Sequence, residues 1–246
     1  IFICAVTTGC SGKKQITVGS ESDLDNLSIG VQGGTTGETY VKESHPTAKV
    51  NAFKSGMDAA LDLKNGGIDA IVLDELPAKS IVAQNSDLTI VDLDLASEKY
   101  AIAIKKGNTE LTEKINTAIE AMQSDGSYKL FTDAFMPSSG AITPPAVIET
   151  SGDVIKMGTN AAFAPFEYLD GTEIVGFDIS ASQYIAKNMG KKLEVVNMDF
   201  DALIPALSSG QIDFIAAGMS VNPERLENCD FSMNYYESKQ VVILRK

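Results

Sequence analysis

Two stretches of the sequence place polar groups where a protein can bind a charged small molecule. Asp74 ends an apolar run, and an acidic residue at the carboxyl end of a buried parallel strand faces the crevice where α/β proteins bind ligands. Residues 33–36, Gly-Gly-Thr-Thr, follow another apolar run and precede a helical segment, which leaves backbone N–H groups free to point at an anion. These residue types predict a crevice bordered by an acidic side chain and an anion-binding turn.

Each feature also has a purely structural interpretation. Asp74 is placed to act as the N-cap of a helix expected over residues 77–83. The glycine–threonine stretch can equally be an ordinary turn that ends in a threonine N-cap. The residues alone leave both interpretations open.

The elements that position Asp74 occur twice in the chain. Residues 199–225 have the pattern of a short helix, a tight glycine turn, a buried strand and a polar loop, and residues 57–77 repeat the helix, the turn and the strand. The aligned pairs are Leu63 and Leu207, Gly66 and Gly210, Asp69 and Asp213, and Asp74 and Gly218. Two copies are too few for a solenoid, so the repeat predicts two related lobes that face each other. A cleft between such lobes is where a small ligand binds.

Composition excludes several other classes of function. The chain has 246 residues and 44% hydrophobic content, enough for two modest lobes. Its net charge of -13 argues against a nucleic-acid partner or an anionic membrane surface. No apolar run reaches the roughly 18 to 20 residues that a membrane helix needs. Because there is no CxxC spacing and His45 is the single histidine, neither a zinc site nor any other cofactor is expected.

The amino terminus has its own pattern. Residues 1–6 are apolar, small residues precede Cys10, and a polar tether follows. This stretch resembles a bacterial lipoprotein signal, although Thr7 stands where such signals usually have Leu. The resemblance implies that Cys10 carries a lipid and that residues 1–21 are a signal remnant and tether. The alternative is a buried first strand.

Periodicity predicts that strands and helices alternate through the rest of the chain, which is typical of α/β lobes with mostly parallel sheets. Strands are expected over residues 27–32, 49–53, 68–73, 88–93, 100–104, 154–159, 193–197 and 239–244. Helices are expected over residues 109–122, 127–135 and 180–189, and a small hairpin around Asp170 and Gly171. Residues 137–152, rich in proline and small residues, are expected to be a surface tether.

Three motifs closely resemble the solute-binding proteins of polar amino-acid ABC importers. They are GTNAAFAPFEY (158–168) with VGFD (175–178), the stretch 199–225 continued through DFS (230–232), and SIGVQGGTTG (28–37) with residues 70–77. The likeness covers nearly the whole chain apart from the tether and the amino terminus. It implies a two-lobed fold like that of periplasmic binding proteins, in which each lobe is a mostly parallel sheet flanked by helices and a hinge joins the lobes.

The order of the motifs departs from that of the family. The segment that usually opens the mature chain comes second here, which indicates a circular permutation with residues 137–152 joining the usual ends. The family's second lobe is then expected over residues 22–98 and its first lobe over residues 99–246. In this order the chain is expected to cross between the lobes once, near residues 97–101. A monomer is expected, with lobe exchange between two molecules as the alternative.

The resemblance also implies a site for an α-amino acid, which needs an anion site for its carboxylate and an acceptor for its ammonium. Arg225 offers a planar bidentate fork for a carboxylate. Ser220 and Thr36 add a hydroxyl and backbone N–H groups near helix starts. Asp74 and the Gly218 carbonyl would accept from the ammonium. The full set implied is Thr35, Thr36, Asp74, Asn160, Phe163, Phe200, Gly218, Met219, Ser220 and Arg225.

Three of these positions concern the ligand's side chain. Phe163 and Phe200 match the family positions that sandwich it, with core packing as the alternative. Asn160 stands where many relatives, including those for cationic amino acids, carry Asp. Because an amide lacks the charge, the resemblance favours a neutral polar ligand such as glutamine or cystine.

The implied protein is therefore extracytoplasmic, attached to the bacterial cell membrane only through its lipid. It captures a free amino acid by lobe closure and delivers it to an ABC transporter permease, without catalysis. Binding of arginine, lysine or histidine is one alternative. A second is an enzyme of the cyclohexadienyl-dehydratase type on the same scaffold, and a third is a sensory or adhesive ligand-binding domain. No nucleophile–base pair or GxxxxGK loop is visible in the sequence.

Overall fold

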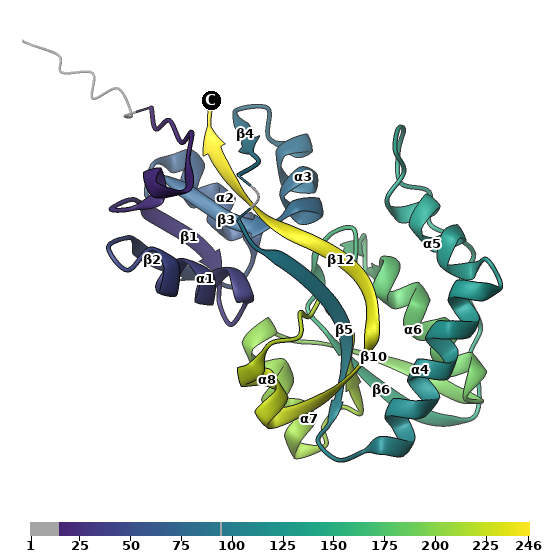
Figure 1. The fold of residues 1–246 in the computed structure, drawn as a ribbon. Helices are drawn as coiled ribbons and strands as arrows, with labels where there is room; N and C mark the ends of the chain where they lie inside the picture. Colours follow the sequence, from purple (N-terminus) through teal and green to yellow (C-terminus); the bar gives the residue numbers. More distant parts are fainter. Residues whose placement is uncertain (1–14, 94) are drawn as a thin grey trace, which may run out of the picture.

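The computed structural model describes residues 15–93 and 95–246 and has two lobes joined by two long strands (Figure 1). The described residues up to 93 form most of the small lobe, and residues 97–239 form most of the large lobe. The predicted two-lobed α/β fold is confirmed. The lipidation predicted for Cys10 lies outside the described residues.

The small lobe is built on parallel strands covered by helices. In chain order it contains η1 (Glu21–Leu24), β1 (Ser28–Gln32), α1 (Thr36–Ser44), β2 (Lys49–Phe53), α2 (Gly56–Asn65), β3 (Ala70–Asp74), α3 (Glu75–Gln84) and β4 (Leu88–Val91). β1 lies between β2 and β3 and is parallel to both. Val18 is buried with Leu24 in this lobe's core, so the expected tether over residues 1–21 is wrong at its carboxyl end, because an apolar side chain there gains a packing partner.

The large lobe repeats this plan. It contains β5 (Ser97–Lys105), α4 (Thr109–Ser124), α5 (Ser127–Phe135), β6 (Asp153–Thr159), β7 (Ala162–Phe163), β8 (Glu167–Asp170), β9 (Glu173–Val175), α6 (Phe177–Asn188), β10 (Lys191–Asn197), η2 (Phe200–Ala202), α7 (Leu203–Ser209), β11 (Phe214–Ile215), α8 (Pro223–Asn228) and β12 (Cys229–Arg245). β6 lies between β10 and β11 and is parallel to both. Residues 137–152, between α5 and β6, form neither helix nor strand, as predicted.

The two lobes are related by the repeat that the sequence shows. Gly66 and Gly210 end α2 and α7 in the left-handed conformation, with φ of 82° and 79°. Directly before β3, Asp69 accepts a hydrogen bond from the backbone N–H of Ser28 at 2.9 Å, and directly before β11, Asp213 accepts one from Lys156 at 2.7 Å. The same local contacts therefore build both units.

The lobes are joined twice, by β5 and by β12. β12 pairs antiparallel with β5 from Cys229 to Lys239 and then continues beside β3 and β4 from Gln240 to Arg245. The expectation of a single crossing is therefore wrong, and the last six residues of the strand belong to the small lobe's sheet. Polar residues and irregular register before Tyr236 interrupt the alternation that would have marked one long strand.

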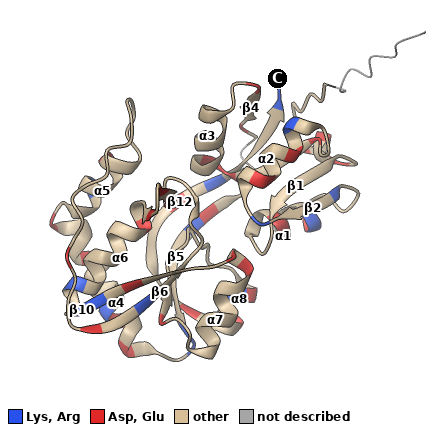
Figure 2. Ribbon diagram, turned by 180° about the vertical axis from the view of Figure 1, so that it is seen from behind, with Lys and Arg blue, Asp and Glu red and all other residues tan. Residues whose placement is uncertain are grey.

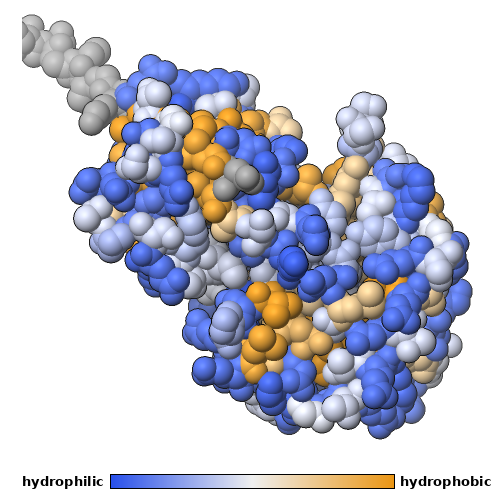
Figure 3. Space-filling model, viewed as in Figure 1, coloured by the Kyte–Doolittle hydropathy of each residue, from blue (hydrophilic) through white to orange (hydrophobic). Residues whose placement is uncertain are grey.

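Acidic and basic residues are interspersed over both lobes in the described part of the chain (Figure 2), and apolar patches on the visible face are separated by hydrophilic residues (Figure 3). Among the described residues, no helix is both long and apolar enough to cross a bilayer.

Candidate ligand-binding site

A small cavity, nearly filled by its own wall, lies between the lobes, close to the two joining strands. Both lobes contribute to its wall. The lining residues are Gln32, Thr35, Thr36, Asp74, Asn160, Phe163, Phe200, Gly218, Ser220 and Arg225. Nine of the ten residues singled out in the sequence are thus brought to one place from segments far apart in the chain.

Arg225 is a buried cation that has no carboxylate partner. Its side chain is 6% exposed, and it takes part in none of the ion pairs between described residues. The guanidinium donates to the carbonyl of Ser220 at 2.7 Å and to that of Gly34 at 2.9 Å, and it lies 5.4 Å from the centre of the Phe200 ring. Burial lowers the pKa of Arg225, because the charged form loses hydration. An anion in the cavity would offset that cost.

Asp74 is the opposite case, a buried acid without a cation. It ends β3 at 5% exposure, and its Oδ1 has no hydrogen-bond partner. Burial, with the neighbouring Glu98 carboxylate, raises the pKa of Asp74 to about 7. Asp74 occupies the N-cap position of α3, yet its side chain makes no capping hydrogen bond. The structure therefore favours the crevice interpretation of Asp74 over the capping one.

The glycine–threonine turn serves both interpretations. Thr35 is the N-cap of α1 and accepts a hydrogen bond from the backbone N–H of Glu38. Its hydroxyl also donates to the carbonyl of Gln32 at 2.7 Å. Thr36 is the first residue of α1 and lines the cavity together with Thr35. The capping contact therefore fixes the turn at the cavity wall.

Two amides face each other across the lobes at the remaining end of the cavity. The Gln32 Nε2 donates to the Asn160 Oδ1 at 2.9 Å, and the Asn160 Nδ2 donates to the carbonyl of Met198 at 2.8 Å. The Oε1 of Gln32 is buried and has no partner. Phe163 and Phe200 supply the apolar walls. This end of the cavity can hold a polar group between aromatic faces.

Gln32 is a wall residue that sequence reasoning missed. The repeat extends far enough to identify it, because Gly30 and Gly158 have equivalent surroundings. A Cβ on Gly30 would clash with Ile68, just as a Cβ on Gly158 would clash with Ile212. Counting two residues on from each glycine pairs Gln32 with Asn160. The sequence signal for Gln32 therefore lies upstream of the two repeated stretches, as an extension of the same repeat.

Met219 is the one predicted site residue that does not line the cavity. Its side chain is 1% exposed and packs in the large lobe's core, and its carbonyl accepts from the backbone N–H of Ala101. Gly218 and Ser220 on either side line the cavity, while the Met219 side chain faces the core.

The lobes are closed onto each other around the cavity. Besides the amide pair and the contact from Arg225 to Gly34, the Lys54 ammonium lies 2.9 Å from the Asp199 carboxylate across the gap. A larger groove borders the cavity at Phe163, but no charged side chain lines it. Among the described residues, no group of three or more His, Cys, Asp or Glu is placed to hold a metal. The chemistry for a charged ligand is thus in the smaller cavity.

Comparisons with known proteins agree with this geometry. Residues 155–246 match the model of the family described as bacterial extracellular solute-binding proteins, family 3. The arginine-binding extracellular protein ArtP of Bacillus subtilis is 44% identical over 90 residues, which are 37% of this chain and 35% of that protein. ABC transporter arginine-binding protein 1 of Escherichia coli is 31% identical over 129 residues, 50% of this chain and 53% of that protein. Other matched relatives are named for histidine and cystine.

The aligned parts span between about a third and about half of the length of these curated relatives. Over a longer stretch, a ligand-binding component of an ABC-type import system from Staphylococcus aureus shares the fold, with a TM-score of 0.50 and 16% identity over 89% of this chain and 65% of that one. Residues 155–246 are therefore similar to family 3 of the bacterial extracellular solute-binding proteins.

Proposed function

We propose that the chain captures a free α-amino acid in the interlobe cavity and delivers it to an ABC importer. The observation that carries the proposal is the pair formed by Arg225 and Asp74, two buried groups of opposite charge that face one cavity and have no ion-pair partner among the described residues. An α-amino acid is a zwitterion, and it supplies the carboxylate and the ammonium that these side chains need.

A transport role is favoured over catalysis. The matched relatives are named as binding proteins. The buried groups of the cavity are arranged to satisfy a ligand's charges, which is a binding chemistry. The family description and these names also support an extracytoplasmic location and an ABC transporter permease as partner. Attachment through a lipid on Cys10 and a monomeric state complete the proposal.

Two ligand classes fit the side-chain end of the cavity. The amides of Gln32 and Asn160 can exchange hydrogen bonds with a neutral amide or a cystine half, which favours glutamine or cystine. A cationic side chain is the second candidate, because the free Gln32 Oε1 and the faces of Phe163 and Phe200 can also receive a guanidinium or an imidazolium. Relatives named for arginine, histidine and cystine support each class.

Isothermal titration calorimetry with glutamine, cystine, arginine and histidine tests the proposal. At least one of the four is expected to bind with a 1:1 stoichiometry. Absence of binding by all four to folded protein would contradict the proposed function.

Asn160→Asp separates the two ligand classes. A carboxylate at this position would favour a cationic side chain by charge pairing and disfavour a neutral one. If the native ligand is neutral, the variant should lose affinity for it and gain affinity for arginine. A variant that binds every ligand as the native protein does would show that Asn160 does not contact the side chain.

A further inference from the structure

Behind the cavity wall, two carboxyl groups are buried together in the large lobe. Glu167 in β8 is 0% exposed, and Asp178 in the first turn of α6 is 1% exposed. The two lie within hydrogen-bond reach of each other. Backbone contacts hold their elements together, since the N–H groups of Phe177 and Asp178 donate to the carbonyls of Pro165 and Phe166.

Only one of the four carboxyl oxygens has a donor from elsewhere in the described protein. The Oδ2 of Asp178 accepts from the backbone N–H of Gly218 at 2.8 Å and from the hydroxyl of Tyr235 at 2.8 Å. The Oδ1 of Asp178 and both oxygens of Glu167 have no such partner. Two adjacent buried anions without donors would be very costly, whereas one shared proton satisfies two of the three orphan oxygens.

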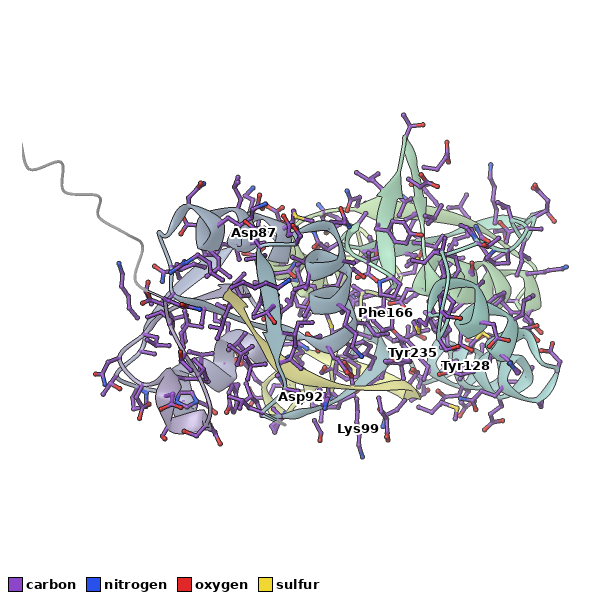
Figure 4. All side chains as sticks on the ribbon, turned by 90° about the horizontal axis from the view of Figure 1, so that it is seen from above. Asp87, Asp92, Lys99, Tyr128, Phe166 and Tyr235 are labelled. Carbon is purple, nitrogen blue, oxygen red and sulfur yellow. The ribbon has the colours of Figure 1, made fainter. Side chains whose placement is uncertain are left out.

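Among the described residues, no cation contributes to the electrostatics of either acid. Phe166, Phe177 and Tyr235 pack against one another beside the pair, and Tyr128 is a further titratable group near Asp178. Tyr128, Phe166 and Tyr235 lie close together in the large lobe (Figure 4). Burial, together with the Asp178 carboxylate, raises the pKa of Glu167 well above its usual range, and burial raises the pKa of Asp178 less, to about 6.

We propose that Glu167 and Asp178 share one proton and that the pair positions Gly218 in the wall of the ligand cavity. The O–H of Glu167 donates to the Oδ1 of Asp178, and the Asp178 carboxylate, which keeps its single negative charge, holds the N–H of Gly218. Glu167 and Asp178 are positioning residues, since neither lines the cavity.

Gly218 needs such support because its backbone is unusual. Its φ is 51°, in the left-handed region, and a Cβ at this position would lie 2.6 Å from the Phe163 ring. Phe163 in turn is the direct cross-strand neighbour of Glu167. The carboxyl pair thus supports two adjacent parts of the wall, the Gly218 backbone and the Phe163 ring. The inference rests on the proposed function, in which Gly218 lies beside the ligand's ammonium.

Two substitutions of similar size separate positioning from mere packing. Glu167→Gln keeps a hydrogen-bond donor toward Asp178, and Glu167→Met keeps the volume but removes the donor. Calorimetry with the amino acid that binds best, beside thermal unfolding without ligand, gives affinity and stability for each. We expect Glu167→Gln to stay within about threefold of the native affinity and Glu167→Met to lose about tenfold or more, since the Asp178 anion then lacks its partner.

Infrared spectroscopy tests the shared proton in the native protein. At neutral pH the native protein should show a carbonyl stretch of a protonated, buried carboxylic acid that is lost in Glu167→Gln, whereas any such band from Asp74 should be common to both proteins. This readout does not depend on ligand binding or on the folding of Glu167→Met. If the native protein binds no amino acid, the proposed function fails, while the infrared difference still decides the carboxyl pair.

Two results would overturn the inference. One is an infrared difference spectrum between the native protein and Glu167→Gln that lacks the band of a protonated carboxylic acid. The other is a folded Glu167→Met that binds the amino acid as tightly as the native protein does, in which case the pair is structural filling only.

Discussion

Arg225 and Asp74 are the residues whose charges the protein leaves for a ligand. Each is nearly fully buried, and neither has an oppositely charged partner among the described ion pairs. Losing one partner of a desolvated charge pair costs about 2 to 5 kcal/mol in binding. At the residue scale, these two side chains should therefore dominate the affinity.

Alanine substitution at either position tests this dominance. Arg225→Ala and Asp74→Ala should each weaken amino-acid binding by well over tenfold, as measured by calorimetry. Lys54→Ala is a matched control, because it removes an exposed ion pair with Asp199 that should contribute little. If either cavity variant binds like the native protein, its residue has been assigned wrongly.

The pKa of Asp74 predicts that binding is coupled to protons. Without ligand the pKa of Asp74 is raised to about 7, with Glu98 and Arg225 as the charged groups nearby. A ligand ammonium needs the ionised form and lowers that pKa, so binding should release protons near neutral pH and affinity should rise as the pH approaches about 7. In the free protein, stability depends on pH with the opposite sign. Because folding raises the pKa of Asp74, the contribution of Asp74 to the free energy of unfolding falls as the pH rises through the same range.

Calorimetry in two buffers with different heats of ionisation measures the proton release directly. Identical binding heats in both buffers would contradict the coupling. Cavity residues of this kind could be identified from the sequence because they stand at strand ends in a repeat. The sequence could not show that Met219 lies outside the cavity wall, because both of its neighbours, Gly218 and Ser220, line the cavity. Only the structure shows that the Met219 side chain packs in the core.

At the scale of elements, the helix–turn–strand repeat explains why the two walls of the site are similar. The left-handed glycine at the end of α2 and of α7 turns the chain into the strand whose end reaches the cavity. This much was predictable from the sequence, since glycine spacing and buried runs are local signals. The full length of β12 was not, because bulges between Phe231 and Tyr236 break its period and pairing with distant strands completes it.

Gly210→Ala tests the left-handed turn of the large lobe. A Cβ at φ 79° costs about 1 kcal/mol relative to glycine, so the free energy of unfolding should fall by roughly that amount. Ser208→Ala, an exposed substitution in the same helix, is the control. Urea unfolding that gives the two variants equal stability would be inconsistent with the strained turn.

At the scale of the whole molecule, β5 and β12 connect the two lobes through paired backbone (Figure 1). We propose that the chain is a circular permutation, in which the family's first-lobe and second-lobe segments stand in reversed order, with lobes near residues 22–98 and 99–246. The crossing of β12 refines these boundaries, because residues 240–245 complete the small lobe's sheet. This crossing depends on pairing between strands that are far apart in the sequence, so no local sequence pattern predicts it.

Removal of residues 240–246 tests the role of the second crossing. Four apolar side chains from Val241 to Leu244 are buried there, worth on the order of 6 kcal/mol or more, comparable to the whole stability of a small domain. The small lobe should then fail to fold, which limited proteolysis between residues 15 and 96 would detect. Removal of Lys246 alone should leave it intact, and a protease-resistant small lobe in the longer deletion would contradict the account.

The central claim, that the cavity binds a zwitterion through Arg225 and Asp74, is tested most directly with ligand analogues. Calorimetry would compare the best-binding amino acid with its carboxamide, which lacks the carboxylate, and with its deamino analogue, which lacks the ammonium. The account predicts that the intact amino acid binds and that each analogue loses well over tenfold in affinity. An analogue that binds as tightly as the amino acid would contradict it.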